Sequence, residues 1–257
     1  MIWIQRGLLV LTLVFAGLTV WLALEIRSVP LPDQFTLPNG FETPILAMEF
    51  PRGTQDLGFI RGLENEDMRR HIFVVQYIDQ YFPYAYGGLL ASFLATIMIM
   101  MMRQYADRRL GALIFIPLLV FTTFTVIQSD FLENERIDRV LSAVITDASS
   151  AADSLDRNAR SVSVSAWSKW TYISAVIALM SAFLISLKYR VLGGLVGIPV
   201  LFLLYARFID PSGPAIEFMA QAIAVFFLAI PVLAVYFLVL SFRRTEPENE
   251  SPRQVET

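Results

Sequence analysis

Six mostly apolar stretches, each long enough to cross a bilayer, limit what this chain can fold into. They cover residues 7–25, 74–102, 110–129, 167–187, 191–208 and 215–242. A helix needs about 20 apolar residues to cross the hydrocarbon core, where it must satisfy its backbone hydrogen bonds internally. The sequence therefore predicts an all-α fold, a polytopic bundle of about six transmembrane helices. We expect residues 1–244 to form a single transmembrane domain.

The composition agrees with a membrane protein and excludes several function classes. Hydrophobic residues make up 56% of the 257 residues and charged residues only 17%, against about a quarter charged in soluble domains. The net charge of −3 provides no basic surface for nucleic acid. With no cysteine and one histidine, His71, we expect no Cys- or His-based metal site and no cofactor. Gly-rich phosphate loops and the common hydrolase motifs are also absent from the sequence.

Charge is distributed unevenly over the segments between the apolar stretches. If the six stretches cross the membrane in turn, the short basic segments all lie on one side of it, close to the ends of the spans. Their basic residues are Arg6, Arg103, Arg108, Arg109, Lys188, Arg190, Arg243 and Arg244. In the two long connections, 26–73 and 130–166, acids balance or outnumber the arginines. The positive-inside rule then predicts that both termini are cytoplasmic and that the two long loops form an external cap.

The two ends of the chain carry further expectations. The apolar run after Arg6 is long for a signal peptide and lacks a small-x-small cleavage motif, so we expect a retained first span. Residues 245–257 are polar and acidic, which predicts a disordered cytoplasmic tail.

The two long loops differ in their predicted structure. Prolines and Asn39-Gly40 predict turns in the first loop, in which Thr54 is expected to cap a short helix through Leu63. Leu57, Ile60 and Phe59 would form the apolar face of that helix.

The second loop has neither Gly nor Pro from residue 131 to residue 160. We expect the third span to continue as a helix to about residue 147. A looser polar return, with a second short helix at 149–159, would follow before the fourth span.

Ionisable and polar residues at the span ends are the candidate site. An ionisable group at membrane depth is costly, so it usually faces a partner or a water-filled cavity. The candidate polar cluster comprises Asp79, Asp130, Glu133, Asn134, Arg207 and Glu217, with His71 nearby. Asp130, Glu133 and Asn134 share one helix face, whereas Glu133–Arg136 and Glu135–Arg139 are expected to pair on a solvated surface.

Three roles are open to such a cluster. It can tie helices together through Arg–carboxylate pairs, or it can relay protons during transport. It can also act in acid–base or metal-assisted hydrolysis if burial separates the pKa values of its carboxyl groups.

The fifth span contains a Gly-x-x-x-Gly pair, Gly193 and Gly197. Small residues at this spacing let a second helix approach closely. We therefore expect this face to pack against another span.

Two short motifs carry a resemblance. The segment ILAMEF (45–50) resembles a "FELA"-like loop element of uncharacterised bacterial multi-span membrane proteins, from which it departs at Pro51. DFLEN (130–134) resembles a D-x-x-E-N element of the same proteins, and Asp79 is similar to an aspartate after their first loop. The resemblance brings no activity. It implies that Glu49, Asp79, Asp130, Glu133 and Asn134 belong to a shared core.

The leading functional hypothesis is a non-enzymatic accessory or interaction subunit of the bacterial inner membrane. Its partners would be the lipid bilayer and another membrane protein. The alternatives are a small transporter or proton-coupled carrier that uses the acidic cluster at its outer mouth, and a carboxylate-dependent membrane hydrolase.

Overall fold

A computed structural model describes residues 1–104, 108–145 and 152–243. Within these residues it contains helices and no strand, and six helices are long and apolar enough to cross a membrane. These helices are α1 (Ile2–Ser28), α4 (Phe82–Gln104), α5 (Arg108–Ile145), α6 (Ala152–Ser186), α7 (Arg190–Phe208) and α8 (Gly213–Arg243). The predicted all-α helical bundle is confirmed. The expected tail lies outside the described residues.

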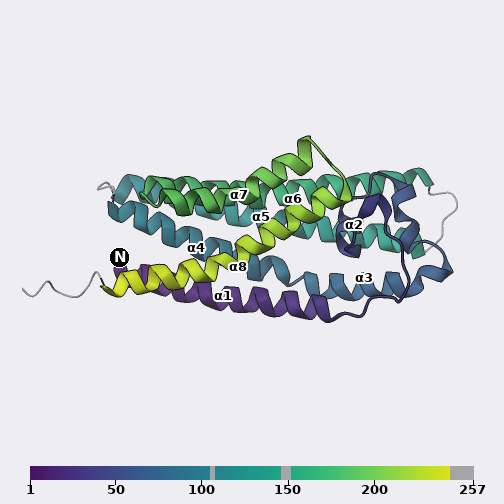
Figure 1. The fold of residues 1–257 in the computed structure, drawn as a ribbon, viewed down its shortest axis with the longest axis horizontal. Coiled ribbons are helices and arrows are strands. Elements are labelled where there is room, and N and C mark those ends of the chain that lie inside the picture. Colours follow the sequence, from purple (N-terminus) through teal and green to yellow (C-terminus); the bar gives the residue numbers. More distant parts are fainter. Residues whose placement is uncertain (105–107, 146–151, 244–257) are drawn as a thin grey trace, which may run out of the picture.

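The six helices run side by side along the long axis of the molecule (Figure 1), and their contacts close into a ring. Along the chain, α1 packs against α4, α4 against α5, α5 against α6, α6 against α7 and α7 against α8; α8 then packs against α1. At the point of closure, the Arg6 guanidinium donates to Ser241 Oγ at 3.2 Å and to the Ser241 carbonyl oxygen at 2.8 Å. The first and last spans are therefore joined by a buried charged side chain.

The two ends of the bundle differ in chemistry. The start of α1 and the end of α8 lie at one end, and Arg103 at the end of α4 donates there to Gln5 Oε1 at 2.6 Å. The α6–α7 turn, with Lys188 and Arg190, lies at the same end, because Tyr189 packs on Phe237 of α8. We call this the basic end and the opposite one the cap end.

The second span is interrupted near the cap end. Two residues separate the end of α3 (Glu66–Asp79) from the start of α4, so the helix expected over 74–102 is two helices. Pro83 explains the restart: it has no N–H to bond to the preceding turn and fits best in the first turn of a helix. Asp79 is consequently the last residue of α3.

α5 and α6 extend beyond the other spans at the cap end (Figure 1). α5 ends at Ile145, close to the predicted boundary. The short helix expected over 149–159 is helical over its described part, 152–159, but the loose return expected after it is wrong over 160–166, where α6 continues without a break. α6 is helical there because Leu155, Ala159, Val162 and Ala166 form a buried stripe at helical spacing. Residues 146–151 lie outside the described parts of the chain.

The first loop folds back over the cap end. It contains the helix α2 (Pro44–Glu49) and the 3-10 helices η1 (Pro38–Gly40), η2 (Thr54–Ile60) and η3 (Leu63–Asn65). Leu57, Phe59 and Ile60 are buried, as predicted. Thr54 is not a side-chain cap: its hydroxyl is buried without a hydrogen bond to a described residue. Its backbone N–H instead donates to Asp156 Oδ1 of α6 at 3.1 Å.

The glycine pair of α7 faces α6, as predicted. A Cβ on Gly193 would lie 2.8 Å from the Ser181 carbonyl oxygen, and one on Gly197 would lie 3.0 Å from Ser181 Oγ. By contrast, a Cβ on Gly194 would have no neighbour within 4 Å among the described residues.

We predict that Gly193→Ala destabilises the bundle by about 1–3 kcal/mol, because the added methyl group overpacks the α6 backbone. Gly194→Ala is the matched control and should unfold like the wild type. Thermal unfolding of the detergent-solubilised proteins measures both. Equal midpoints for the two variants would contradict the close approach of α7 to α6.

Candidate functional site

A buried lysine lies where the cap meets the bundle. The Lys169 ammonium of α6 is 2.9 Å from Glu49 Oε1 of α2 and 3.3 Å from Asp130 Oδ1 of α5. It also pairs with the carboxylate of Glu133, one helical turn after Asp130. We call these four residues the lysine cluster. Their side chains are 0–9% exposed, so the cluster is sealed from solvent.

Helical spacing places the two α5 acids. Asp130, Glu133, Asn134 and Ile137 are all buried on one face, as their i, i+3, i+4, i+7 spacing predicts. On α6, Lys169 follows Ala166 by three residues and precedes Ile173 by four, and both of these are buried. Each charged side chain therefore projects from the apolar stripe of its own helix toward the neighbouring helix.

Glu49 brings α2 to this site. Its second carboxylate oxygen, Oε2, accepts a hydrogen bond of 3.0 Å from the indole nitrogen of Trp170. The following residue, Phe50, packs edge-on against Trp167 with the ring centroids 4.8 Å apart. Both carboxylate oxygens of Glu49 and the next side chain thus fix α2 to α6.

Asp79 adjoins the lysine cluster through one intermediate. Asn134 Nδ2 donates to Asp79 Oδ2 at 3.1 Å, which ties the end of α3 to α5. Tyr86 of α4 lies next to Asp130 with its hydroxyl group buried. The cluster and its surroundings therefore involve α2, α3, α4, α5 and α6.

The lysine cluster contains more acidic groups than basic ones. Three carboxyl groups share one ammonium, and buried charges are costly unless they are paired and hydrogen-bonded. Glu133 is the most extreme case, because it is 0% exposed and neither of its carboxylate oxygens accepts a regular hydrogen bond from a described residue. The Lys169 ammonium is consequently the central electrostatic stabiliser of this region.

The other two members of the predicted cluster lie elsewhere. The Arg207 guanidinium stacks over the Trp167 ring at 4.7 Å. Glu217 of α8 accepts hydrogen bonds from the backbone N–H groups of Glu42 and Thr43, at 3.1 and 2.7 Å, and from the Thr43 hydroxyl at 2.8 Å. Glu217 therefore fastens the first loop to α8.

One predicted neighbour of the cluster and one of the two predicted ion pairs on α5 are not found. His71 is remote from the cluster, since its ring bonds to the Pro30 carbonyl oxygen at 2.8 Å. The exposed Glu135–Arg139 pair is confirmed at 2.5 Å. The Glu133–Arg136 pair is wrong, because Arg136 reaches α6 instead and donates to the Ser161 carbonyl oxygen at 2.9 Å.

Sequence reasoning missed Lys169 as the counter-ion. The available signal was its position between Trp167 and Trp170 at the start of an apolar span. A lysine at that depth needs a carboxylate partner. The pairing with Glu49 depended on the fold of the first loop, and the pairing with Asp130 and Glu133 depended on how α5 packs against α6.

The cluster is not arranged as a metal centre. Across residues 1–104, 108–145 and 152–243, no group of three or more His, Cys, Asp or Glu is placed to hold a metal ion. The lysine ammonium occupies the position between the carboxylates that a cation would take.

Comparison with known proteins gave no match to a family model, to a curated protein or to a solved structure.

We predict that Lys169→Met destabilises the protein by about 3–5 kcal/mol, because it leaves buried carboxylates without their counter-charge. Denaturant unfolding in detergent micelles and proteolysis of residues 29–43 would measure the loss. Lys188→Met removes an exposed lysine and should unfold like the wild type.

If Lys169→Met does not accumulate, the double variant Lys169→Met/Glu133→Gln should recover part of the yield, since it removes one buried negative charge. Wild-type stability in Lys169→Met would show that the ammonium is not needed.

Proposed function

We propose that this chain is an integral membrane accessory protein whose cap end binds another membrane protein. The observation that carries the proposal is a row of exposed aromatic side chains along α3 and the start of α4. Phe73, Tyr77, Tyr81 and Tyr84 follow helical spacing and are 62%, 62%, 52% and 58% exposed. We call them the aromatic row. Exposed clusters of this kind are typical of protein interfaces, where Tyr and Phe are enriched.

The depth of the aromatic row favours a protein partner over lipid tails. α4 alone has 23 residues, which span about 35 Å at 1.5 Å per residue. That length already crosses a hydrocarbon core of about 30 Å. α3 therefore extends beyond the core, and Phe73 and Tyr77 would lie in the headgroup region or above it.

The lysine cluster supports the same proposal through rigidity. It fixes α2 to α5 and α6, while the Asn134–Asp79 hydrogen bond fixes the end of α3 to α5. A surface that is ordered before binding loses less conformational entropy on association. A rigid cap of this kind suits an interaction subunit.

We further propose the orientation and the membrane. The basic end carries Arg6, Arg103, Lys188 and Arg190, which the positive-inside rule assigns to the cytoplasm. Both termini would then be cytoplasmic and the cap external. The bacterial inner membrane is proposed from the sequence resemblance.

The test is affinity purification from the native membrane in mild detergent, with wild type and Phe73→Ala/Tyr77→Ala compared. Buried aromatic anchors contribute about 2 kcal/mol or more to binding, so we expect recovery of the partner to fall more than about ten-fold. Phe121→Ala, at a 64% exposed site on α5 in the apolar span, is the matched control and should retain the partner.

A photocrosslinker at position 77 would give a second readout. Recovery of only a lone protomer, with no protein adduct at position 77, would overturn the proposal.

A second candidate function is a proton-coupled carrier, favoured by the sealed Glu133 carboxylate, whose Oε1 atom has no hydrogen-bond partner among the described residues. Buried carboxyl groups of this kind serve as proton relays in membrane proteins. The carboxylate-dependent hydrolase gains no comparable support, because the side chains of the lysine cluster are at most 9% exposed and so offer a substrate no access.

If the carrier function holds, Glu133→Gln should abolish proton flux in proteoliposomes loaded with a pH-sensitive dye. Glu135→Gln, two residues away and exposed, should retain the wild-type rate. Equal flux through wild type, both variants and empty liposomes would remove this candidate.

A further inference from the structure

A long apolar groove runs between α7 and α8, far from the lysine cluster. It consists of two adjoining hollows of about 570 and 500 Å³, which share Leu192, Leu195 and Leu233. The hollow nearer the cap end is lined almost entirely by apolar side chains, with Gln221 as its one amide. Volumes of this size are typical of sites for small ligands.

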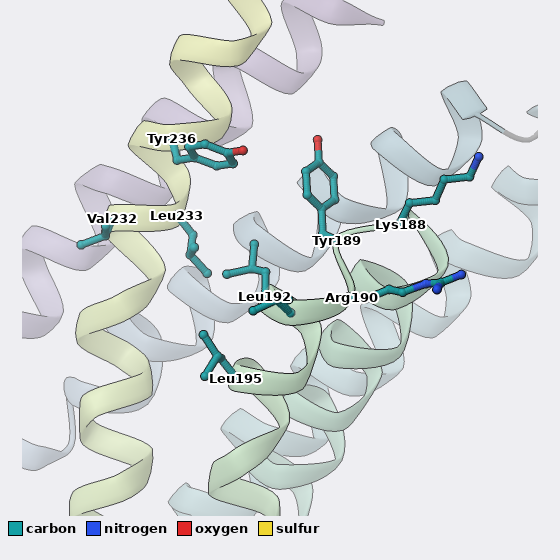
Figure 2. Close-up of a pocket in the computed structure, with 9 residues that line it drawn as sticks. Lys188, Tyr189, Arg190, Leu192, Leu195, Val232, Leu233 and Tyr236 are labelled. Carbon is teal, nitrogen blue, oxygen red and sulfur yellow. The ribbon is translucent and has the colours of Figure 1, made fainter.

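The other hollow opens at the basic end. Figure 2 shows Leu192, Leu195, Leu233 and Tyr236 along its wall, while Lys188 and Arg190 reach outward from the turn at its end. Neither cation forms an ion pair or a side-chain hydrogen bond with any residue that the structure describes. No acid is among the residues that line either hollow. The groove thus joins an apolar furrow to two positive charges that have no acidic partner among the described residues.

We propose that this groove binds an anionic phospholipid. One acyl chain would lie in the furrow between α7 and α8, and the phosphate would lie at the mouth beside Lys188 and Arg190. Basic residues at the membrane surface between transmembrane helices attract anionic headgroups. The hydroxyl groups of Tyr189 and Tyr236, at the same end, are additional donors for the phosphate (Figure 2).

The shape of the groove favours an acyl chain over a helix from another protein. α7 and α8 contact each other near the cap end, where the Phe202 and Phe218 rings are 4.8 Å apart. Near the basic end, Tyr189, just before α7, packs on Phe237 of α8 at 5.3 Å. The space is therefore a furrow between packed helices. A helix with its side chains is about 10 Å wide and would rest across the furrow, whereas an acyl chain can enter it.

The experiment uses the full chain in phosphatidylcholine vesicles that contain a trace of lipid with a photoactivatable acyl chain. The probe is either phosphatidylglycerol or phosphatidylcholine, and mass spectrometry locates the adducts. We expect phosphatidylglycerol to label residues 192–202 and 218–233 several-fold more than phosphatidylcholine does. Lys188→Gln and Arg190→Gln should each lower this ratio by about five-fold at most, the effect of one cation near the surface.

Two matched variants sharpen the result. Arg243→Gln removes an exposed cation at the same end that does not line the groove, and it should leave the ratio unchanged. Leu195→Trp fills the furrow from its exposed side and should reduce labelling by both lipids. Equal labelling by the two lipids in the wild type would overturn the proposal.

The lipid proposal would also be overturned if a second copy of the chain filled the groove. The chain has no cysteine, so Val232→Cys introduces a single thiol at a 68% exposed groove position. A disulfide-linked dimer of this variant in vesicles, together with weak lipid labelling, would assign the groove to a second copy of the chain. We expect Val232→Cys to remain monomeric under oxidation.

Discussion

The Lys169 ammonium is the positive charge on which the cap end depends. It lies between a carboxylate of the first loop and two carboxylates of α5, so it joins segments that are far apart in the sequence. Without it, neither α2 nor the extended part of α5 would have a charge partner on α6. An ion pair in a sealed site is a weak source of net stability, but removing one member is costly. The cluster is therefore better understood as a device that fixes geometry than as a source of stability.

The lysine cluster is one of several contacts that fix the first loop and position the aromatic row. The Trp170–Glu49 hydrogen bond and the Phe50–Trp167 contact place α2 against α6 in one arrangement. The Glu217 carboxylate holds the preceding turn to α8 in the same way. The first loop is thus anchored on two sides of the ring, and the aromatic row on α3 is presented beside it. At the other end of the bundle, Lys188 and Arg190 leave a charged edge beside an apolar furrow.

The sequence predicted the spans well because hydrophobic length is a local property. The shared face of Asp130, Glu133 and Asn134 could also be predicted, since helical spacing alone defines it. The ion pairs of Lys169 could not be predicted, because they depend on how α2 and α5 pack against α6, and no local pattern contains that information. The continuous helix from Ala152 was missed for a related reason, because tertiary packing of its buried stripe outweighed weak local signals. The break between α3 and α4 did have a local signal, Pro83, which the prediction of one helix over 74–102 did not use. Arg207 and Glu217 were grouped with the acids by depth, although their partners proved to be a tryptophan ring and the backbone of the first loop.

The closure of the ring by Arg6 and Ser241 has a consequence for how the protein is made. α1 precedes the other described spans in the chain, yet it packs against α8, the last of them, as well as against α4. Until α8 enters the membrane, the Arg6 guanidinium has no Ser241 to bind, and one side of α1 faces lipid. The contacts that close the ring can therefore form only after all six described spans have been inserted. A chain that lacks α8 would retain the contact between the Arg6 guanidinium and the Trp3 ring within α1, but not the hydrogen bonds to Ser241.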